Sequence, residues 1–202
     1  MEKTIPWPTI SDMHKILFLL IFTAGTYCGF AQEPDVREFN STDVVTGNNL
    51  SLLSYLEKKG VVLLFISNTC PYAQYYEDRI KSMVDTYREQ DIAFLLVNSH
   101  LDNDESPSSM KRMWESWNID IPYLADKSQN LQRTFDIRKS PTAVILKPVN
   151  EGFSIYYSGK IDNNPLVEND VKEAFLQDNI RSLLENKPPV HANNQPVGCM
   201  IR

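Results

Sequence analysis

The chain has 202 residues and a net charge of −6 at pH 7, with 42% hydrophobic and 23% charged residues. These proportions are those of an ordinary folded protein and exclude disordered, collagen-like and coiled-coil chains. No basic cluster is interleaved with aromatic residues, so we expect no nucleic-acid partner. The seven glycines are not spaced for a phosphate loop, and the three histidines and three cysteines lack zinc spacing; we therefore expect no cofactor and no metal.

Residues 1–31 have the features of a secretory signal. A basic start at Met13 precedes the apolar stretch 16–24, and small residues follow at Gly29 and Ala31. We expect cleavage after Ala31, with residues 1–12 as an over-extended start, and an exported protein in the periplasm or outside the cell. The apolar stretch is shorter than the ~20 residues that span a bilayer, so no stable membrane insertion is expected. Lipidation of Cys28 is the alternative, although bulky Tyr27 precedes it, where lipoprotein signals have a small residue.

Residues 32–186 predict one α/β domain. The expected elements, in chain order, are strands 42–45 and 50–52, helix 53–59, strand 61–66, a four-turn helix from Pro71, strand 92–97, helix 107–117, an extended piece 121–124, helix 128–135, a hairpin of 142–146 with 153–157, and helix 166–185. The runs 61–66, 92–97 and 142–146 are continuously apolar, which is typical of strands covered on both faces. This order predicts a central mixed sheet flanked by helices.

Residues 187–202 form a tail rich in Pro, Asn and Gly, without helical periodicity. We expect this tail, which carries Cys199, to be flexible until it docks. A polar, acidic loop at 102–105 is expected to be a solvated surface loop, since it lacks the spacing of a calcium loop.

Cys70 has the position of a reactive thiol. It follows the strand 61–66 and precedes Pro71, and Pro is common at the first position of a helix. Cys70 is therefore the expected N-cap, where unpaired backbone N–H groups and the helix dipole favour the thiolate. The alternative is a free cysteine packed as a small apolar residue. Arg79, further along the same helix, could face the site, but we expect it on the solvated side of the helix.

Five short motifs occur in matching order with a known family. They are Asn68-Thr69-Cys70-Pro71-Tyr72, Tyr76-Glu77-Asp78-Arg79, Ser140-Pro141-Thr142, the segment from Gly159 to Pro165, and Pro196-Val197-Gly198-Cys199. Together they resemble the thioredoxin-like redoxin family, in its branch related to alkyl hydroperoxide reductase and thiol-specific antioxidant proteins. The resemblance implies a thioredoxin fold with Cys70 as the attacking cysteine. It also implies a cis peptide between Ser140 and Pro141 beside that cysteine, and contacts of Pro71, Tyr72, Ser140 and Pro141 with an incoming peptide or thiol.

Two departures from the thioredoxin pattern concern the second cysteine. Ala73 stands where a CxxC motif has its second Cys, and Lys139 stands where some members of the branch carry another. Cys199 is then the remaining candidate to resolve an intermediate on Cys70. The alternatives are a static Cys70–Cys199 disulfide that only stabilises the fold, and an unpaired Cys199.

Two hypotheses of function follow. The first is an exported thiol oxidoreductase or thiol-dependent peroxidase, in which Cys70 attacks a peroxide or a protein disulfide and an unidentified reductant restores it. The second is a non-catalytic thioredoxin-fold binding module that carries a protein or a metal. The candidate metal ligands are Cys70, His100 and His191. Nothing in their spacing selects this set, and a histidine in a polar tail is usually solvated.

Overall fold

The computed structural model describes residues 36–202. The expected signal at residues 1–31, with its cleavage site and Cys28, lies outside the described residues. Within residues 36–202 no helix is long and apolar enough to cross a membrane.

A seven-stranded mixed sheet forms the centre of the fold, in the order β2-β1-β5-β4-β3-β7-β8. Its strands are β1 (Asn40–Asp43), β2 (Asn49–Ser51), β3 (Gly60–Phe65), β4 (Ile92–Asn98), β5 (Tyr123–Ala125), β7 (Thr142–Val149) and β8 (Gly152–Gly159). β3 pairs in parallel with β4 and antiparallel with β7, and β7 forms a hairpin with β8. The expected mixed sheet is therefore confirmed, with β3 near its centre.

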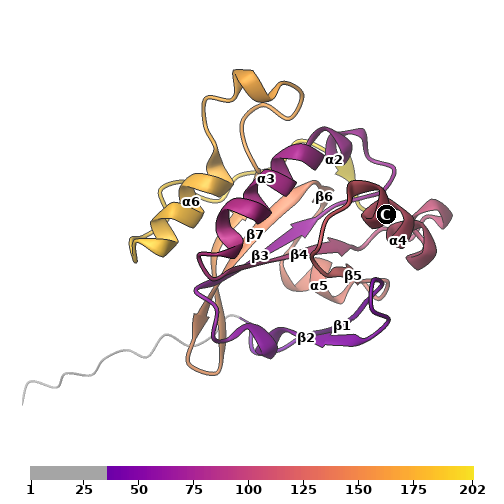
Figure 1. Cartoon of the computed structure of the whole chain (residues 1–202), viewed down its shortest axis with the longest axis horizontal. Coiled ribbons are helices and arrows are strands. Elements are labelled where there is room, and N and C mark those ends of the chain that lie inside the picture. The colour runs from indigo at the N-terminus through magenta and orange to yellow at the C-terminus, as the bar shows by residue number, and fades with distance from the viewer. Residues whose placement is uncertain (1–35) are drawn as a thin grey trace, which may run out of the picture. The chain divides into compact units, whose positions relative to one another are not determined.

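Helices cover both faces of the sheet. α2 (Pro71–Tyr75), α3 (Glu77–Arg88), α4 (Pro107–Trp117) and α6 (Phe175–Leu184) pack into one apolar cluster, and α5 (Asn130–Thr134) with the 3-10 helix η1 (Leu52–Tyr55) packs into a second. Figure 1 shows α3 and α6 together on one face of the sheet. Along β3, Val62 and Leu64 belong to the first cluster, whereas Val61 and Leu63 belong to the second. This alternation explains why β3 is apolar at every position.

Four expected helices differ from those observed. The helix expected from Pro71 is divided at Tyr76 into α2 and α3. The helices expected at 53–59 and 128–135 are shorter, since only Leu52–Tyr55 and Asn130–Thr134 are helical. The prediction of one helix over 166–185 was wrong in its first half, which holds only the short 3-10 helix η3 (Glu168–Asp170).

Asparagine side chains explain the missing half of that helix. Asn164 Oδ1 accepts hydrogen bonds from the backbone N–H groups of Leu166 and Val167, and Asn163 Oδ1 accepts from Lys172 and Glu173. Such side-chain bonds compete with helical ones and favour a loop. α6 therefore begins only at Phe175, where buried residues resume.

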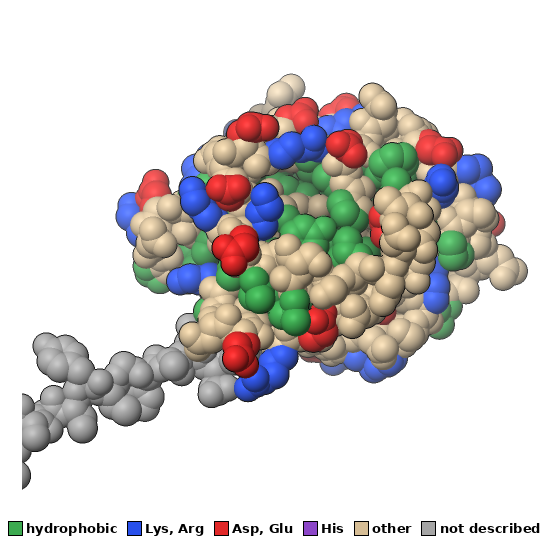
Figure 2. Space-filling view, turned by 60° about the horizontal axis from the view of Figure 1, so that its bottom comes forward, with side chains coloured by type: hydrophobic (Ala, Val, Ile, Leu, Met, Phe, Trp, Pro, Cys, Tyr) green, Lys and Arg blue, Asp and Glu red, His purple; other side chains and the backbone are tan. Residues whose placement is uncertain are grey.

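Acidic and basic side chains alternate over the molecular face that Figure 2 shows, around a central group of hydrophobic side chains. No broad area of one sign of charge is visible on that face. A continuous basic surface is what binding to a phosphate backbone would need.

Candidate active site

Cys70 lies at the junction between β3 and α2. It is the N-cap residue of α2, with extended backbone angles of φ −79° and ψ 116°, and Pro71 occupies the first turn, as predicted. α2 is only five residues long, and the Cys70 side chain makes no capping hydrogen bond. The side chain is 1% exposed. Cys70 is thus held in place by its surroundings more than by the helix that it begins.

Cys70 and Cys199 form a disulfide across 129 residues, with their Cα atoms 5.9 Å apart. Cys199 belongs to β9 (Cys199–Met200), a short strand near the end of the chain, and it is half-buried. The sequence left open whether the two cysteines meet, and in this structure they do.

Ser140 and Pro141 lie directly beside the disulfide. Their peptide bond is cis, as the family resemblance implied. The carbonyl oxygen of Ser140 is 3.4 Å from Cys70 Sγ. β6 (Lys139–Ser140) pairs antiparallel with β9, which places Ser140 opposite Cys199. The segment before the cis-proline therefore contacts both cysteines.

A buried carboxylate, Glu105, organises the loop that leads to Cys70. It accepts hydrogen bonds from Ser67 Oγ at 2.5 Å, from the backbone N–H of Asn68 at 2.9 Å, and from the backbone N–H and hydroxyl of Thr69 at 3.1 and 2.8 Å. Ser67 Oγ in turn accepts from the backbone N–H of Cys70 at 3.1 Å. One side chain thus fixes the three residues before Cys70.

Burial alone would raise the pKa of the Glu105 carboxyl. The hydrogen bonds from Ser67, Asn98 and the neighbouring loop favour the ionised form and together lower the pKa to about 2. The prediction of a solvated loop at 102–105 was therefore wrong at Glu105, which is fully buried. No sequence signal separates Glu105 from its polar neighbours, because its burial depends on tertiary contacts with Ser67 and Asn98.

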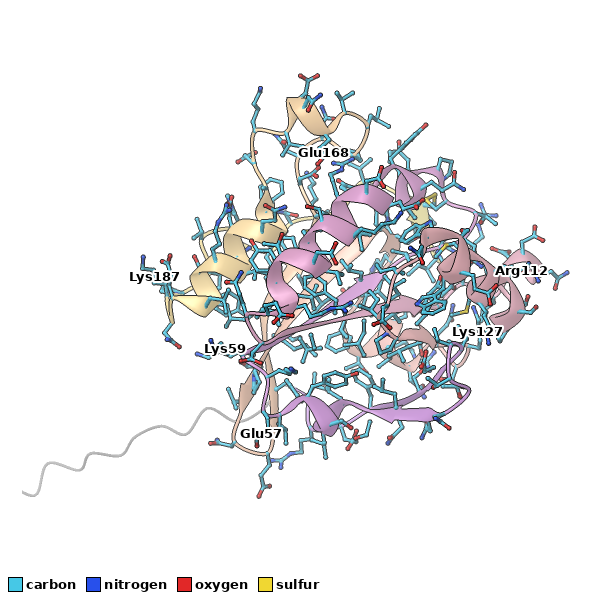
Figure 3. All side chains as sticks on the ribbon, in the orientation of Figure 1. Glu57, Lys59, Arg112, Lys127, Glu168 and Lys187 are labelled. Atoms are coloured by element: carbon cyan, nitrogen blue, oxygen red, sulfur yellow. A yellow bond between two sulfur atoms is a disulfide. The ribbon has the colours of Figure 1, made fainter. Side chains whose placement is uncertain are left out.

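Polar side chains connect Glu105 with Ser140. Asn98 at the end of β4 donates to Glu105 at 2.6 Å and accepts from Lys127 Nζ at 3.1 Å. Lys127 also donates to the carbonyl oxygen of His100 at 2.7 Å, and His100 Nε2 is 3.0 Å from Ser140 Oγ. Burial lowers the pKa of the His100 imidazole. Figure 3 shows Lys127 at the end of the molecule near α4, whereas Lys59, just before β3, is at the opposite end.

The expectation of a solvated Arg79 was also wrong. Arg79 is 6% exposed and forms an ion pair with Asp162 at 2.5 Å. It also donates to the backbone oxygens of Tyr75, Asn164 and Pro165. Its spacing could have shown this, because position 79 is three residues after buried Tyr76 and four before buried Met83.

The remaining predicted site residues differ in exposure and in their neighbours. Pro71 is exposed next to Cys70, and Tyr72 is half-buried against the first apolar cluster. Their contacts with a partner stay a prediction. His191 is not simply solvated: it lies 2.8 Å from Asp178 and packs on Phe175. His100 and His191 therefore have different neighbours, and residues 36–202 contain no cluster of three or more metal-ligating side chains.

Known proteins resemble this chain in sequence and in fold. The model of the AhpC/TSA family matches residues 34–163. The thiol-disulfide oxidoreductase ResA of Halalkalibacterium halodurans is 25% identical over 107 residues, which are 53% of this chain and 58% of that protein. The matched part thus spans little more than half of the relative's length.

Two solved structures share the fold over most of their length. An uncharacterised conserved protein from Geobacillus kaustophilus has a TM-score of 0.74 at 23% identity, covering 86% of this chain and 93% of its own. A hypothetical protein from Sinorhizobium meliloti 1021 has a TM-score of 0.73 at 21% identity, covering 83% and 92%. DsbF of Mycobacterium tuberculosis, solved in its mixed oxidised and reduced forms, has a TM-score of 0.51 at 18% identity, covering 61% of this chain and 87% of its own. The fold is thioredoxin-like, and the chain belongs to the AhpC/TSA family.

Proposed function

We propose that this protein is a thiol-disulfide oxidoreductase in which Cys70 is the attacking cysteine and Cys199 the resolving one. The observation that supports it most is the Cys70–Cys199 disulfide, which joins the strand-to-helix junction to a short terminal strand. The AhpC/TSA match and the ResA relative support thiol chemistry. A second cysteine on the tail takes the place of the one missing at Ala73.

The proposed reaction moves two electrons to a partner protein. The Cys70 thiolate attacks one sulfur of a partner disulfide, and the other partner sulfur leaves as a thiolate. The Cys199 thiolate then attacks Cys70 Sγ, which releases the partner's second cysteine as a thiolate and forms the Cys70–Cys199 disulfide. A dithiol reductant then reduces the Cys70–Cys199 disulfide, becomes a disulfide itself, and restores both thiols. Cys199 is the more exposed of the two sulfur-bearing residues and is the expected point of its attack.

The neighbouring residues suit a protein substrate. Ser140 and Pro141 lie buried beside Cys70 at the edge that β9 covers, and exposed Pro71 with half-buried Tyr72 forms the adjoining rim. We propose that these four residues contact the partner. Arg79, a buried cation on α3, is bound to Asp162 and three backbone oxygens. It is thus engaged elsewhere and does not polarise a peroxide, which favours a disulfide as the oxidant.

We propose that the protein acts outside the cytoplasm. The signal-like residues 1–31 and the disulfide support this location, because disulfides persist in oxidising compartments. Mass spectrometry of the secreted or periplasmic protein would identify its first residue, which is Gln32 if the signal is cleaved as expected.

The function is tested with single-cysteine variants and a model protein that has one exposed disulfide. Cys199→Ser is expected to give a stable mixed disulfide at Cys70, one per chain, without turnover. Cys70→Ser is expected to abolish exchange, because the tail thiol alone lacks the site. The parent chain, which has both cysteines, is the reference and should turn over the substrate without accumulating the mixed disulfide.

The same variants separate the alternatives. Exchange that survives in Cys70→Ser would contradict the assignment of the attacking cysteine. Sulfenic acid at Cys70 after peroxide, with no mixed disulfide from the protein substrate, would favour a peroxidase. Tight retention of a protein or metal without either reaction would favour the binding module.

A further inference from the structure

The terminal strand occupies an edge that is otherwise unpaired. β6 and β9 form a two-stranded sheet separate from the central one, with Lys139 opposite Met200 and Ser140 opposite Cys199. The backbone N–H of Ile201 also donates to the carbonyl oxygen of Arg138 at 3.0 Å. Removal of this strand would leave the backbone groups of β6 open for another extended segment.

Gly198 makes the closest approach between the tail and this edge. A Cβ atom at residue 198 would lie 2.1 Å from the carbonyl oxygen of Ser140 and 2.7 Å from its carbonyl carbon. Both distances are impossible for non-bonded atoms, and the neighbours are backbone atoms that cannot rotate away. The edge therefore accepts an extended segment only if glycine precedes the reacting cysteine.

The positions after Cys199 meet apolar surface. Met200 lines a cavity of about 530 Å³ together with Phe135, Ile137 and Ile155. Ile201 packs against the second apolar cluster. Residues 193–196 of the tail line the same cavity from another side. Met200 is itself 54% exposed, so a segment that replaced the tail would place the second residue after its cysteine, at the position of Ile201, against apolar surface.

We propose that this edge binds an extended partner segment with glycine directly before its cysteine and an apolar residue two positions after it, in place of the chain's own segment Gly198–Ile201. This inference rests on the proposed function and names the substrate class of the same site. The tail is then a built-in competitor. It must leave before the partner binds, and it returns to resolve the mixed disulfide through Cys199.

The test uses the full-length Cys199→Ser chain and two peptides. One reads Pro-Val-Gly-Cys-Met-Ile and the other has alanine in place of its glycine, each with its cysteine in a disulfide with thionitrobenzoate. The Cys70 thiolate attacks the peptide sulfur, a new disulfide joins the two, and coloured thionitrobenzoate leaves as the thiolate. We expect the glycine peptide to react at least about tenfold faster, since the alanine methyl group would overlap with Ser140.

A second variant tests whether tail and peptide share the site. Gly198→Ala in the Cys199→Ser chain should displace the tail and raise the rate with the glycine peptide. Val197→Ala, at an exposed neighbouring side chain, is the control and should leave it unchanged. An unchanged rate with Gly198→Ala would contradict the shared site.

The outcomes distinguish this inference from the proposed function. Equal rates for the two peptides, with Cys70 still reactive toward dithiobis(nitrobenzoate), would contradict the selection for glycine. The proposed oxidoreductase function would not be affected by that result. If Cys70 reacted with neither peptide nor with dithiobis(nitrobenzoate), the proposed oxidoreductase function itself would be contradicted.

Discussion

Glu105 is the side chain that determines the shape of the loop before Cys70. Its carboxylate is fully buried and accepts hydrogen bonds from four residues: Ser67, Asn68, Thr69 and Asn98. A buried charge is tolerated only when it is satisfied in this way. Ionised Glu105 therefore stabilises the folded chain at neutral pH, through the same bonds that position the active-site loop.

Stability should fall in acid because of this residue. The pKa of Glu105 is lowered from 4.5 to about 2 by folding, so its contribution is complete above pH 4.5 and is lost as the pH falls toward 2. The expected contribution is about 3 kcal/mol in the free energy of unfolding. Denaturant unfolding of the parent chain and of Glu105→Gln at several pH values measures it.

Glu105→Gln should be less stable at pH 7 by about 2 to 3 kcal/mol, and its difference from the parent chain should shrink between pH 4.5 and 2. Asp104→Asn removes a charge from the neighbouring exposed side chain and is the matched control. A difference that stays constant over this pH range would show that ionised Glu105 does not have the proposed role.

At the residue scale, the sequence predicted Cys70 but missed Glu105 and misplaced Arg79. Cys70 was predictable because a buried strand and a helix-starting proline flank it. Glu105 belongs to a run of polar residues whose composition is typical of solvent exposure, and only tertiary contacts with Ser67 and Asn98 distinguish it. Arg79 was judged by residue type, although its helical spacing places it among buried side chains.

The ion pair of Arg79 joins two elements of the fold. Arg79 on α3 binds Asp162 in the loop after β8, and Tyr76 donates its hydroxyl to the same carboxylate at 2.8 Å. Arg79 also lies over the Tyr76 ring, 4.0 Å from its centre. These contacts hold α3 to the loop that follows the edge strand β8.

Loss of this ion pair should be costly. Arg79→Met leaves the Asp162 carboxylate buried without its partner, and we expect a loss of about 3 to 5 kcal/mol in the free energy of unfolding. Arg88→Met removes an arginine from the exposed end of α3 and should change stability by no more than about 0.5 kcal/mol. Urea unfolding of the two variants gives the comparison; equal and small changes would mean that the Arg79 ion pair contributes little.

At the element scale, the central strands were predictable and the segments held by side chains were not. The three continuously apolar runs became β3, β4 and β7 with small changes at their ends. The first half of the expected helix 166–185 failed because Asn163 and Asn164 bind its backbone. The sequence of residues 187–202 has no periodicity that predicts where the tail docks. Its position depends on hydrogen bonds that Asn193 and Asn194 accept at the end of β8, and on the close approach of Gly198 to Ser140.

For the whole molecule, the disulfide joins the middle of the chain to its last strand. A cross-link over 129 residues stabilises a fold by about 5 kcal/mol on the chain-entropy model. Stabilisation alone could therefore account for a purely structural disulfide. A catalytic bond must instead open and close while the fold persists. The core of this protein is independent of the tail, because both apolar clusters are built mainly from residues before Asn186.

Redox titration of the two cysteines is the most direct test of the account. The full chain is equilibrated in glutathione buffers from reducing to oxidising, the free thiols are alkylated, and the masses are measured while circular dichroism follows the fold. The account predicts that Cys70 and Cys199 change together in one two-electron transition while the protein stays folded. A disulfide that opens only when the protein unfolds, or two cysteines that never pair, would contradict it.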